Sequence, residues 1–420
     1  MNYIRKDQAV RGIITEVFPV CNVKNVGSGM NLPGGGIEWD QQRKGGDHMK
    51  GIMALLCALA VLTTPVRAVE VEAPAALLME KETGTVLFAK GEHQQLEPAS
   101  VTKVMTLLLV MEAIDAGQLA LDTVVTASAH ACSMGGSQIW LKENEQMTVE
   151  EMLKAVCVVS ANDCAVALAE AVAGSEEAFV EKMNARAAEL GMKDTLFRNA
   201  TGLPAEGHVT SASDIARMSR ELMLRHPEIR TYTTIWMDTL RGGESSLVNT
   251  NKLIRFYEGA TGLKTGSTDA AGYCLSATAE REGMELIAVI LKGTTSAQRF
   301  ADAQALLNHG FSAYTLVNLA AGQALAPIEV SLGQRATVQP VLESRSALLE
   351  KAAAAGLEQK LELPESVEAP VAAGDRLGTL TVSAGGAVVA EVPVLAGETV
   401  PRLTWGEMAL RLLRSACFAA

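Results

Sequence analysis

The sequence predicts an α+β chain that ends in a small all-β domain. Residues from about 100 to 224 carry successive helix patterns, while the segments before and after them alternate with a period of two. From about Leu319 the composition changes to short Val- and Leu-rich runs punctuated by Gly and Pro, a pattern typical of strands. With 420 residues, 48% of them hydrophobic, the chain can form two domains with sizeable cores.

The N-terminal region is predicted to lie outside the folded part. Residues 1–48 show no sustained period, and we interpret them as an over-called or disordered extension. Residues 49–68 contain a charged start, an apolar run over 52–62 and an A-x-A-like end, which together predict a signal peptide. We therefore expect an exported protein whose mature chain begins near Val69. A genuine extension preceding a core helix is the alternative.

The segment 69–317 is predicted to form the larger domain. It opens with a β-hairpin over 75–89 and continues with a core helix from about Ser100 to Ala116. A capping box begins another helix at Thr148. Further helices are expected over 164–173, 176–190 and 214–224, strands over 262–267, 273–279 and 285–292, and a final helix over 297–308 that ends at Gly310.

The remaining residues divide into two parts. Residues 318–400 are predicted to be the β-rich domain. Residues 401–420 alternate leucines with arginines, which fits an amphipathic C-terminal helix that could bind a membrane surface. A helix docked on its own domain is the alternative.

Composition excludes several classes of function. The net charge is −12, aromatic residues make up 4%, and no Lys/Arg block occurs, so nucleic acid is not an expected partner. The histidines show no H-E-x-x-H spacing and the seven cysteines no C-x-x-C pair, so neither a metal nor another cofactor is expected. No apolar run reaches the roughly 18 residues that span a bilayer.

Three short motifs indicate a serine nucleophile with a lysine base. Ser100 and Lys103 are one helical turn apart, and Ser160-Ala161-Asn162 lies in a tight turn between two helices, which we expect to expose Ser160 and Asn162. Lys264-Thr265-Gly266 lies within the strand expected over 262–267. Each motif alone is weak, but together and in this order they match the motif set of penicillin-binding proteins and class A β-lactamases.

Longer segments resemble the low-molecular-mass D-alanyl-D-alanine carboxypeptidases, over roughly residues 75–400. These are Pro98–Lys103, Ser160–Glu170, Asn199–Pro204 and Thr261–Thr268. The resemblance implies a β-lactamase/transpeptidase-like domain: an antiparallel sheet flanked by helices, plus a helical subdomain, with the active site between them. It also implies removal of the terminal D-Ala from peptidoglycan stem pentapeptides in the cell wall outside the cytoplasm, and covalent inhibition by β-lactams.

The proposed chemistry depends on a neutral lysine. A serine hydroxyl needs an adjacent base, and Lys103 can serve only without its proton. Two charges about 4 Å apart at an effective dielectric constant of about 20 repel by roughly 4 kcal/mol, or about three pKa units. We therefore expect Lys264, if it converges on Lys103, to be the larger cause of a lowered pKa, ahead of the helix dipole.

The remaining site residues have supporting roles. Ser160 is the expected proton relay, Asn162 the partner of the substrate amide, and Lys264-Thr265-Gly266 an edge strand to which the substrate backbone adds. The resemblance implies an oxyanion hole formed by the N–H groups of Ser100 and Ser267, and an arginine for the terminal carboxylate, which here is Arg299. Two positions depart from the family: Ser267 replaces a histidine found in some members, and Thr250 a second arginine.

Two other functions stay open at this point. A class A β-lactamase deacylates through a glutamate in an E-x-x-L-N loop, and Glu244–Asn249 is one residue too long for it. A non-catalytic cell-wall-binding protein should lack a motif residue, and none is missing. His208 is expected to be a loop residue, and Cys132, Cys157, Cys164 and Cys274 to be small buried hydrophobic residues.

Overall fold

A five-stranded antiparallel sheet forms the centre of the larger domain. The computed structural model describes residues 69–319, 325–343 and 345–418, with the side chains of 415–418 left out; the predicted extension and signal peptide lie outside these residues. The strand order is β2–β1–β9–β8–β7, so β7, which carries Lys264-Thr265-Gly266, lies at an edge as expected. The strands are β1 (Ala75–Glu80), β2 (Val86–Lys90), β7 (Ala260–Thr268), β8 (Gly272–Arg281) and β9 (Met284–Gly293).

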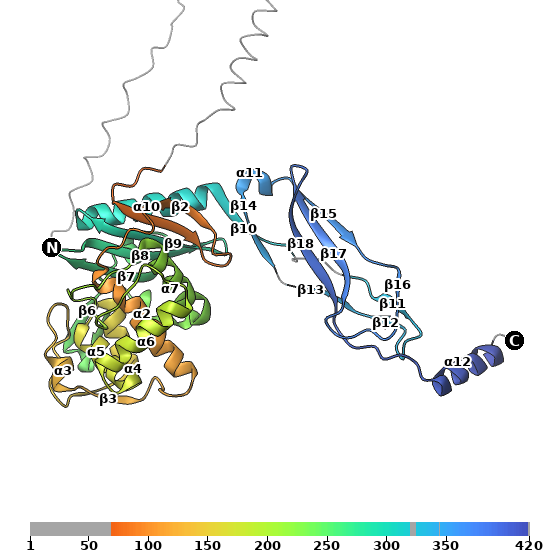
Figure 1. The fold of residues 1–420 in the computed structure, drawn as a ribbon, viewed down its shortest axis with the longest axis horizontal. Coiled ribbons are helices and arrows are strands. Elements are labelled where there is room, and N and C mark those ends of the chain that lie inside the picture. Colours follow the sequence, from red (N-terminus) through yellow and green to blue (C-terminus); the bar gives the residue numbers. More distant parts are fainter. Residues whose placement is uncertain (1–68, 320–324, 344, 419–420) are drawn as a thin grey trace, which may run out of the picture. The chain divides into compact units, whose positions relative to one another are not determined.

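Both faces of the sheet are buried because alternate side chains point into two different cores. Leu77 and Val289 belong to the core shared with the helical part of the domain. Leu78 and Ile290, one residue further along each strand, belong to the core beneath helix α10 (Ser296–Ala313). The sheet is therefore sandwiched between helices (Figure 1). Strands buried on both faces are nearly continuous runs of buried residues, and it is these runs between turns, not an alternation of apolar and polar residues, that the sequence shows.

Helices fill the segment between β2 and β7. The buried helix α2 (Lys103–Asp115) follows the short 3₁₀ helix η1 (Ala99–Thr102). The predicted caps are confirmed: Thr148 forms a capping box and Ser211 accepts a hydrogen bond from the N–H of Asp214. The other helices are α3 (Ala129–Cys132), α4 (Val149–Val158), α5 (Asn162–Ala173), α6 (Glu176–Glu189), α7 (Ala212–Arg225), η2 (Pro227–Ile229), α8 (Arg230–Thr233), η3 (Arg241–Gly243) and α9 (Leu253–Phe256).

Two small hairpins complete this domain. The first pairs β3 (Val124–Thr126) with β4 (Gln146–Thr148), and the second pairs β5 (Met237–Leu240) with β6 (Ser245–Val248).

The prediction that the helix after β9 ends at Gly310 is wrong. Helix α10 continues to Ala313. A Cβ at position 310 would lie 2.4 Å from Cδ1 of Leu286 and 3.0 Å from Cδ2 of Leu78. Gly310 therefore allows the helix to pack closely on the sheet, and it is not a helix terminator.

The C-terminal residues form the predicted β-rich part, with two small apolar cores. Three sheets contribute: β10–β14, β12–β11–β16 and β13–β18–β17–β15. Their strands are β10 (Tyr314–Asn318), β11 (Ile328–Ser331), β12 (Thr337–Val338), β13 (Pro340–Leu342), β14 (Ser346–Glu350), β15 (Leu357–Glu362), β16 (Ser366–Glu368), β17 (Arg376–Ala384) and β18 (Ala387–Ala396), and α11 (Lys351–Ala354) follows β14.

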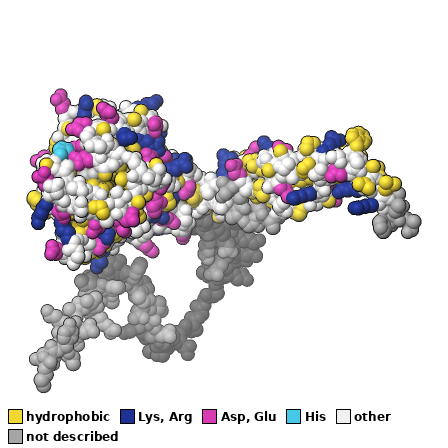
Figure 2. Space-filling view, turned by 90° about the horizontal axis from the view of Figure 1, so that it is seen from below, with side chains coloured by type: hydrophobic (Ala, Val, Ile, Leu, Met, Phe, Trp, Pro, Cys, Tyr) yellow, Lys and Arg dark blue, Asp and Glu magenta, His cyan; other side chains and the backbone are white. Residues whose placement is uncertain are grey.

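The final helix, α12 (Trp405–Phe418), has the predicted amphipathic character. Trp405 is 87% exposed, and Leu410, Leu412 and Leu413 are each more than half exposed. Figure 2 shows apolar and basic side chains exposed side by side on this last segment. Within the part of the chain that the structure describes, no helix combines the length and apolar character needed to cross a bilayer.

Candidate active site

Ser100 and Lys103 lie on one face of a single turn. A 3₁₀ helix has three residues per turn, so residues i and i+3 of η1 are aligned more closely than in an α-helix. Nζ of Lys103 lies 3.0 Å from Oγ of Ser100. The two motif side chains therefore meet, although Ser100 lies in η1 and only Lys103 in α2.

The two other contacts of the Lys103 amine determine how this amine would be oriented in its neutral form. Nζ donates to Oδ1 of Asn162 at 2.5 Å and to the carbonyl oxygen of Thr201 at 2.7 Å. Both are oxygens that can only accept. A neutral amine satisfies them with its two N–H bonds, which leaves its lone pair for the hydroxyl proton of Ser100. The geometry therefore suits Lys103 as a base towards Ser100.

Burial is the main reason why Lys103 can be neutral. Its side chain is fully buried, and this burial lowers its pKa well below the usual lysine value. The positive charge of Lys264 lowers the pKa further, and the charge of Asp163 opposes the shift. Desolvation is thus a larger cause than the repulsion by Lys264, while the expected order of this repulsion and the helix dipole stays a prediction.

The corner between α4 and α5 is not exposed as predicted. Ser160 is only 4% exposed and Asn162 only 3%. The preceding loop covers the corner, since Nδ2 of Asn162 donates to the carbonyl of Gly135 at 2.6 Å and its backbone N–H to that of Ser137 at 2.7 Å.

Ser160 itself is strained and unpartnered. It has φ +65°, a region that non-glycine residues rarely adopt. Its buried hydroxyl oxygen has no hydrogen-bond partner among the described residues. A polar group held in this state is available to a reacting molecule.

Lys264 is the second buried amine of the site. It is 1% exposed, and Nζ donates to the carbonyl of Thr265 at 2.9 Å. Burial lowers the pKa of Lys264 to about 7, with a smaller contribution in the same direction from Arg299. Oγ1 of Thr265 donates to Oγ1 of Thr250 at 2.7 Å, so Thr250 contacts the motif directly.

Gly266 brings the edge strand against the nucleophile. A Cβ at this position would lie 2.8 Å from the backbone nitrogen of Ser100 and 2.9 Å from that of Val101. On another side, a Cβ at Gly202 would lie 1.8 Å from the carbonyl oxygen of Ala99. Two glycines therefore allow β7 and the 199–204 loop to pack on η1, which fixes the backbone of Ser100.

Ser267 and Arg299 flank this arrangement. Ser267 is exposed and pairs with Tyr273 across β7 and β8. Arg299 is 7% exposed, so it is not a surface residue. Its Nη1 donates to the carbonyls of Gly266 at 2.9 Å and Cys274 at 3.2 Å, and its Nε is buried without a hydrogen-bond partner in the described part of the chain. Arg299 therefore supports the edge strand from behind.

Three contributors to the site have no role assigned from the sequence: Thr201, Asn199 and Asp163. The Thr201 carbonyl receives a hydrogen bond from Lys103, and Asn199 shapes that loop by accepting from the N–H groups of Thr201 and Gly202 at 3.1 and 2.7 Å. The Asn-x-Thr-Gly spacing is a turn signal, but a main-chain acceptor leaves no residue-type signature. Asp163 is also buried, and it holds the 139–141 loop by accepting from the N–H groups of Ile139 and Leu141.

His208 occupies a loop as expected, but it is buried. Its Nδ1 accepts from the N–H of Arg198 at 3.3 Å, so Nε2 carries the proton shared with Oγ1 of Thr102 at 2.9 Å. Burial lowers the pKa of His208 to about 4. A histidine that is neutral and bonded on both sides serves structure here.

Three of the four described thiols are buried, and the fourth, Cys132, is partly buried. Burial raises the pKa of Cys157 to about 12 and of Cys274 to about 11, and it raises those of Cys132 and Cys164 as well. All four are unpaired cysteines. Cys157, Cys164 and Cys274 fit the prediction of small buried hydrophobic residues, whereas the prediction is wrong for Cys132, which is only partly buried.

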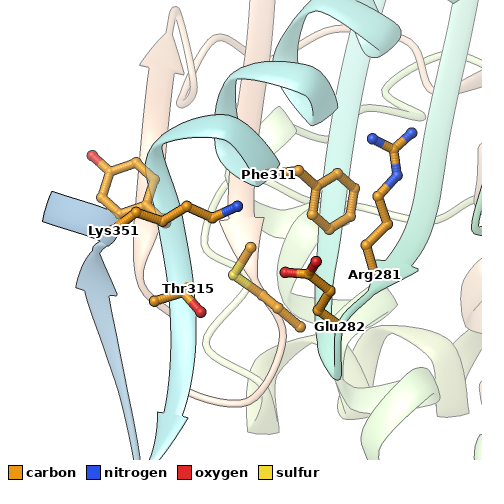
Figure 3. Close-up of a pocket in the computed structure, with 7 residues that line it drawn as sticks. Arg281, Glu282, Phe311, Thr315 and Lys351 are labelled. Carbon is orange, nitrogen blue, oxygen red and sulfur yellow. The ribbon is translucent and has the colours of Figure 1, made fainter. Parts of the chain in front are cut away.

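One cavity among the described residues lies away from the motifs. It has a volume of about 190 Å³ and is lined by residues of β8, β9, α10, β10 and α11: Arg281, Glu282, Met284, Phe311, Tyr314, Thr315 and Lys351. In the view of Figure 3, Lys351 and Arg281 lie on either side of the Phe311 ring, and Arg281 stacks on that ring at 4.8 Å. None of the motif residues lines this cavity.

Fold and site together match a serine hydrolase, with the Lys103 amine lying against the Ser100 hydroxyl where a base would stand. Comparison with known proteins gives the family. Residues 62–295 match the D-alanyl-D-alanine carboxypeptidase model of peptidase family S11, and residues 314–402 match the C-terminal domain of penicillin-binding protein 5. The chain belongs to the D-alanyl-D-alanine carboxypeptidase family.

Relatives and solved structures agree with this assignment. The chain is 42% identical over 337 residues to the D-alanyl-D-alanine carboxypeptidase DacF of Bacillus subtilis, covering 79% of this chain and 86% of the relative. It is 33% identical to DacD of Escherichia coli over 79% and 87% of the two chains. Penicillin-binding protein 5 of Haemophilus influenzae superposes with a TM-score of 0.68 at 28% identity, over 81% of this chain and all of the other.

Proposed function

We propose that this protein hydrolyses the terminal D-Ala–D-Ala bond of peptidoglycan stem pentapeptides through an acyl-enzyme on Ser100. The observation that carries the proposal is the set of three contacts made by the Lys103 amine. Two acceptor-only carbonyls and one hydroxyl surround it, and burial keeps its proton affinity low. This arrangement makes Ser100 a nucleophile at neutral pH.

The reaction proceeds in two acyl-transfer steps. Neutral Lys103 accepts the hydroxyl proton as Oγ of Ser100 attacks the carbonyl carbon of the penultimate D-Ala. The N–H groups of Ser100 and Ser267 stabilise the oxyanion, at about 3–4 kcal/mol for each donor. Ser160 passes the proton from Lys103 to the leaving D-Ala nitrogen, so the C–N bond breaks as the ester forms. A water molecule then attacks the ester carbonyl, Lys103 accepts a proton from this water, and Oγ of Ser100 leaves and is reprotonated.

Substrate binding is assigned to the edge strand and its neighbours. The peptide backbone adds to the free edge of β7 at Lys264-Thr265-Gly266, and Asn162 bonds to the substrate amide. Protonated Lys264 and the Thr265 hydroxyl face the terminal carboxylate, with Arg299 as a further cation. The Thr250 contact with Thr265 supports this arrangement.

Replacement of Ser100 tests the assignment. Ser100→Ala should abolish D-Ala release from a pentapeptide and covalent penicillin labelling, while Ser133→Ala, an exposed serine outside the motifs, should leave both unchanged. The solved structure of penicillin-binding protein D2 of Listeria monocytogenes in its ampicillin-bound form, 33% identical over 57% of this chain with a TM-score of 0.53, motivates the labelling arm. If penicillin still labels Ser100→Ala, the assignment of Ser100 as the nucleophile is wrong.

Intact mass after penicillin exposure separates the alternatives. A stable adduct supports the carboxypeptidase, rapid return to the free mass a β-lactamase, and no adduct a non-catalytic wall-binding protein. The near-miss glutamate of the β-lactamase alternative, Glu244, is exposed next to η3. Nothing in the described site therefore favours that alternative.

We further propose that the enzyme acts outside the cytoplasm and that α12 lies on the membrane surface. The support is the exposure of Trp405, Leu410, Leu412 and Leu413 on a helix that also carries Arg411 and Arg414. The protein should bind anionic phospholipid vesicles, and Leu412→Glu with Leu413→Glu should abolish binding and leave D-Ala release unchanged. Equal binding by the double variant would exclude the helix as the anchor.

A further inference from the structure

We propose that Asp115, His226 and Glu228 form a site for a divalent transition-metal ion, with Zn²⁺ as the representative ion. One carboxylate oxygen of each acid and a ring nitrogen of the histidine lie within 4.8 Å of one another. Asp115 is far from His226 and Glu228 in the sequence, and the spacing of the latter two matches no metal-binding motif. The site therefore cannot be predicted from a sequence motif. The site is distinct from the motif residues that form the proposed active site.

His226 is the feature that distinguishes this group from an ordinary cluster of surface acids. The residue is 4% exposed, and its Nδ1 is buried without a hydrogen-bond partner among the described residues. The same atom lies 3.0 Å from Oδ2 of Asp115 and 3.7 Å from Oε1 of Glu228. The 3.0 Å approach is close enough for a hydrogen bond but does not have its alignment. A buried nitrogen therefore faces two carboxylates without being satisfied by either.

The separations fit metal ligands. With bonds of about 2.0–2.1 Å and a tetrahedral angle, two ligand atoms of zinc stand about 3.4 Å apart. The separations of 3.0 and 3.7 Å at His226 lie on either side of this value. Asp115 and Glu228 are 59% and 51% exposed at their side chains, so both carboxylates can adjust by a few tenths of an ångström. Water would occupy the open coordination position.

Charge and ligand type favour a divalent transition metal. The two carboxylates balance the charge of such an ion, and imidazole nitrogen is a common ligand of zinc but is not typical of calcium or magnesium. Asp115 is the last residue of α2, whose last turn contains no basic residue, and His226 is the C-cap of α7. The negative ends of two helix dipoles therefore meet here and attract a cation.

The backbone holds His226 in place. Its N–H donates to the carbonyl of Leu222, and its own carbonyl accepts from the N–H of Ile229. Pro227 follows directly and restricts the chain at the first position of η2. A metal bound here would connect the end of α2 to the junction of α7 and η2. Lys103 is at the other end of α2, about 18 Å from Asp115 along the helix axis. We therefore assign the ion a structural role.

Metal titration of the full protein tests the site. After chelator treatment, Zn²⁺ should bind and raise the midpoint of thermal unfolding. Asp115→Asn and Glu228→Gln should each weaken this binding by at least about tenfold, and penicillin acylation should not change. His93→Asn is the matched control, because His93 also lies 2.8 Å from a carboxylate, that of Asp194, but has no third ligand among the residues that the structure describes. The control should bind zinc as the unmodified protein does.

Cobalt identifies the ligand type. Co²⁺ in the proposed site should show d–d absorption that is lost in Asp115→Asn, without thiolate charge-transfer bands. Zinc binding that is equal in Asp115→Asn, Glu228→Gln and the unmodified protein would overturn the proposal, as would thiolate bands or no binding at millimolar Zn²⁺. His226 would then serve only as a polar contact of Asp115. Because Asp115 and Glu228 are exposed, their variants should fold even if His226→Gln does not.

Discussion

Replacing Gly266 by alanine should misplace the nucleophile without unfolding the protein. The added Cβ would stand 2.8 Å from the nitrogen of Ser100, 2.9 Å from that of Val101 and 3.0 Å from the carbonyl oxygen of Pro98. All three are backbone atoms, so no side-chain rotation relieves the contact. Restoring ordinary van der Waals distance, which begins at 3.4 Å, requires η1 or β7 to move by about 0.6 Å.

The expected loss follows from that displacement. A misplacement of about 1 Å can reduce the rate by about 10²-fold, so a shift of about 0.6 Å should slow acylation by roughly ten- to a hundredfold. Overpacking should also cost about 1–3 kcal/mol of folding free energy. The rate of penicillin acylation, followed by intact mass, and the unfolding midpoint measure the two effects separately.

Gly135→Ala is the control. Gly135 accepts a hydrogen bond from Asn162 through its carbonyl, but a Cβ there would meet nothing within 4 Å. Its φ does not lie in the left-handed region. This variant should keep the unmodified acylation rate. If Gly266→Ala also acylates at the unmodified rate, the close approach of β7 does not position Ser100, and the argument is wrong.

Three further predictions follow from the same contacts. The rate of acylation should rise with pH as Lys103 loses its proton and should fall as Lys264 loses its proton near pH 7, because burial lowers both pKa values. Lys264→Arg should remove the falling limb of the pH–rate profile. The folding stability of the unmodified protein, compared with that of Lys264→Met, should rise between pH 7 and about 8.5, because the unfolded state binds the Lys264 proton more tightly than the folded state does. The same pH dependence of stability for both proteins in urea titrations would contradict this. Gly310→Ala should cost about 1–3 kcal/mol in the same urea titrations by contact with Leu286, with D-Ala release unchanged.

The sequence predicts correctly those elements of the fold whose signal comes from neighbouring residues. Apolar runs separated by turns identified the strands of the central sheet, and the capping residues Thr148 and Ser211 marked two helix starts correctly. Gly310 shows the limit of such signals. Its conformation is helical, and its absent side chain matters only because Leu286 and Leu78 approach from the sheet. Leu286 and Leu78 are distant from Gly310 in the sequence, so a rule based on neighbouring residues wrongly interprets this glycine as a helix terminator.

The motif residues could be listed from the sequence, but their environment could not. Ser160 and Asn162 were expected on an exposed corner, and the 135–137 loop that buries them has no motif of its own. Thr201 was missed because it contributes a main-chain carbonyl, which every residue possesses. Sequence patterns report side-chain type and spacing, whereas this site depends on which backbone groups surround one amine.

Burial, more than charge repulsion, makes the lysine pair chemically useful. Had repulsion dominated, removing the charge of Lys264 would return Lys103 to an ordinary pKa and the base would be lost. Because desolvation ranks first for both amines, Lys264→Met should leave Lys103 able to act as a base while weakening capture of the substrate carboxylate. That variant should therefore show a larger defect in KM for the peptide than in the rate of acylation at saturation. Loss of acylation at saturating substrate, with binding intact, would show that the Lys264 charge controls the base after all.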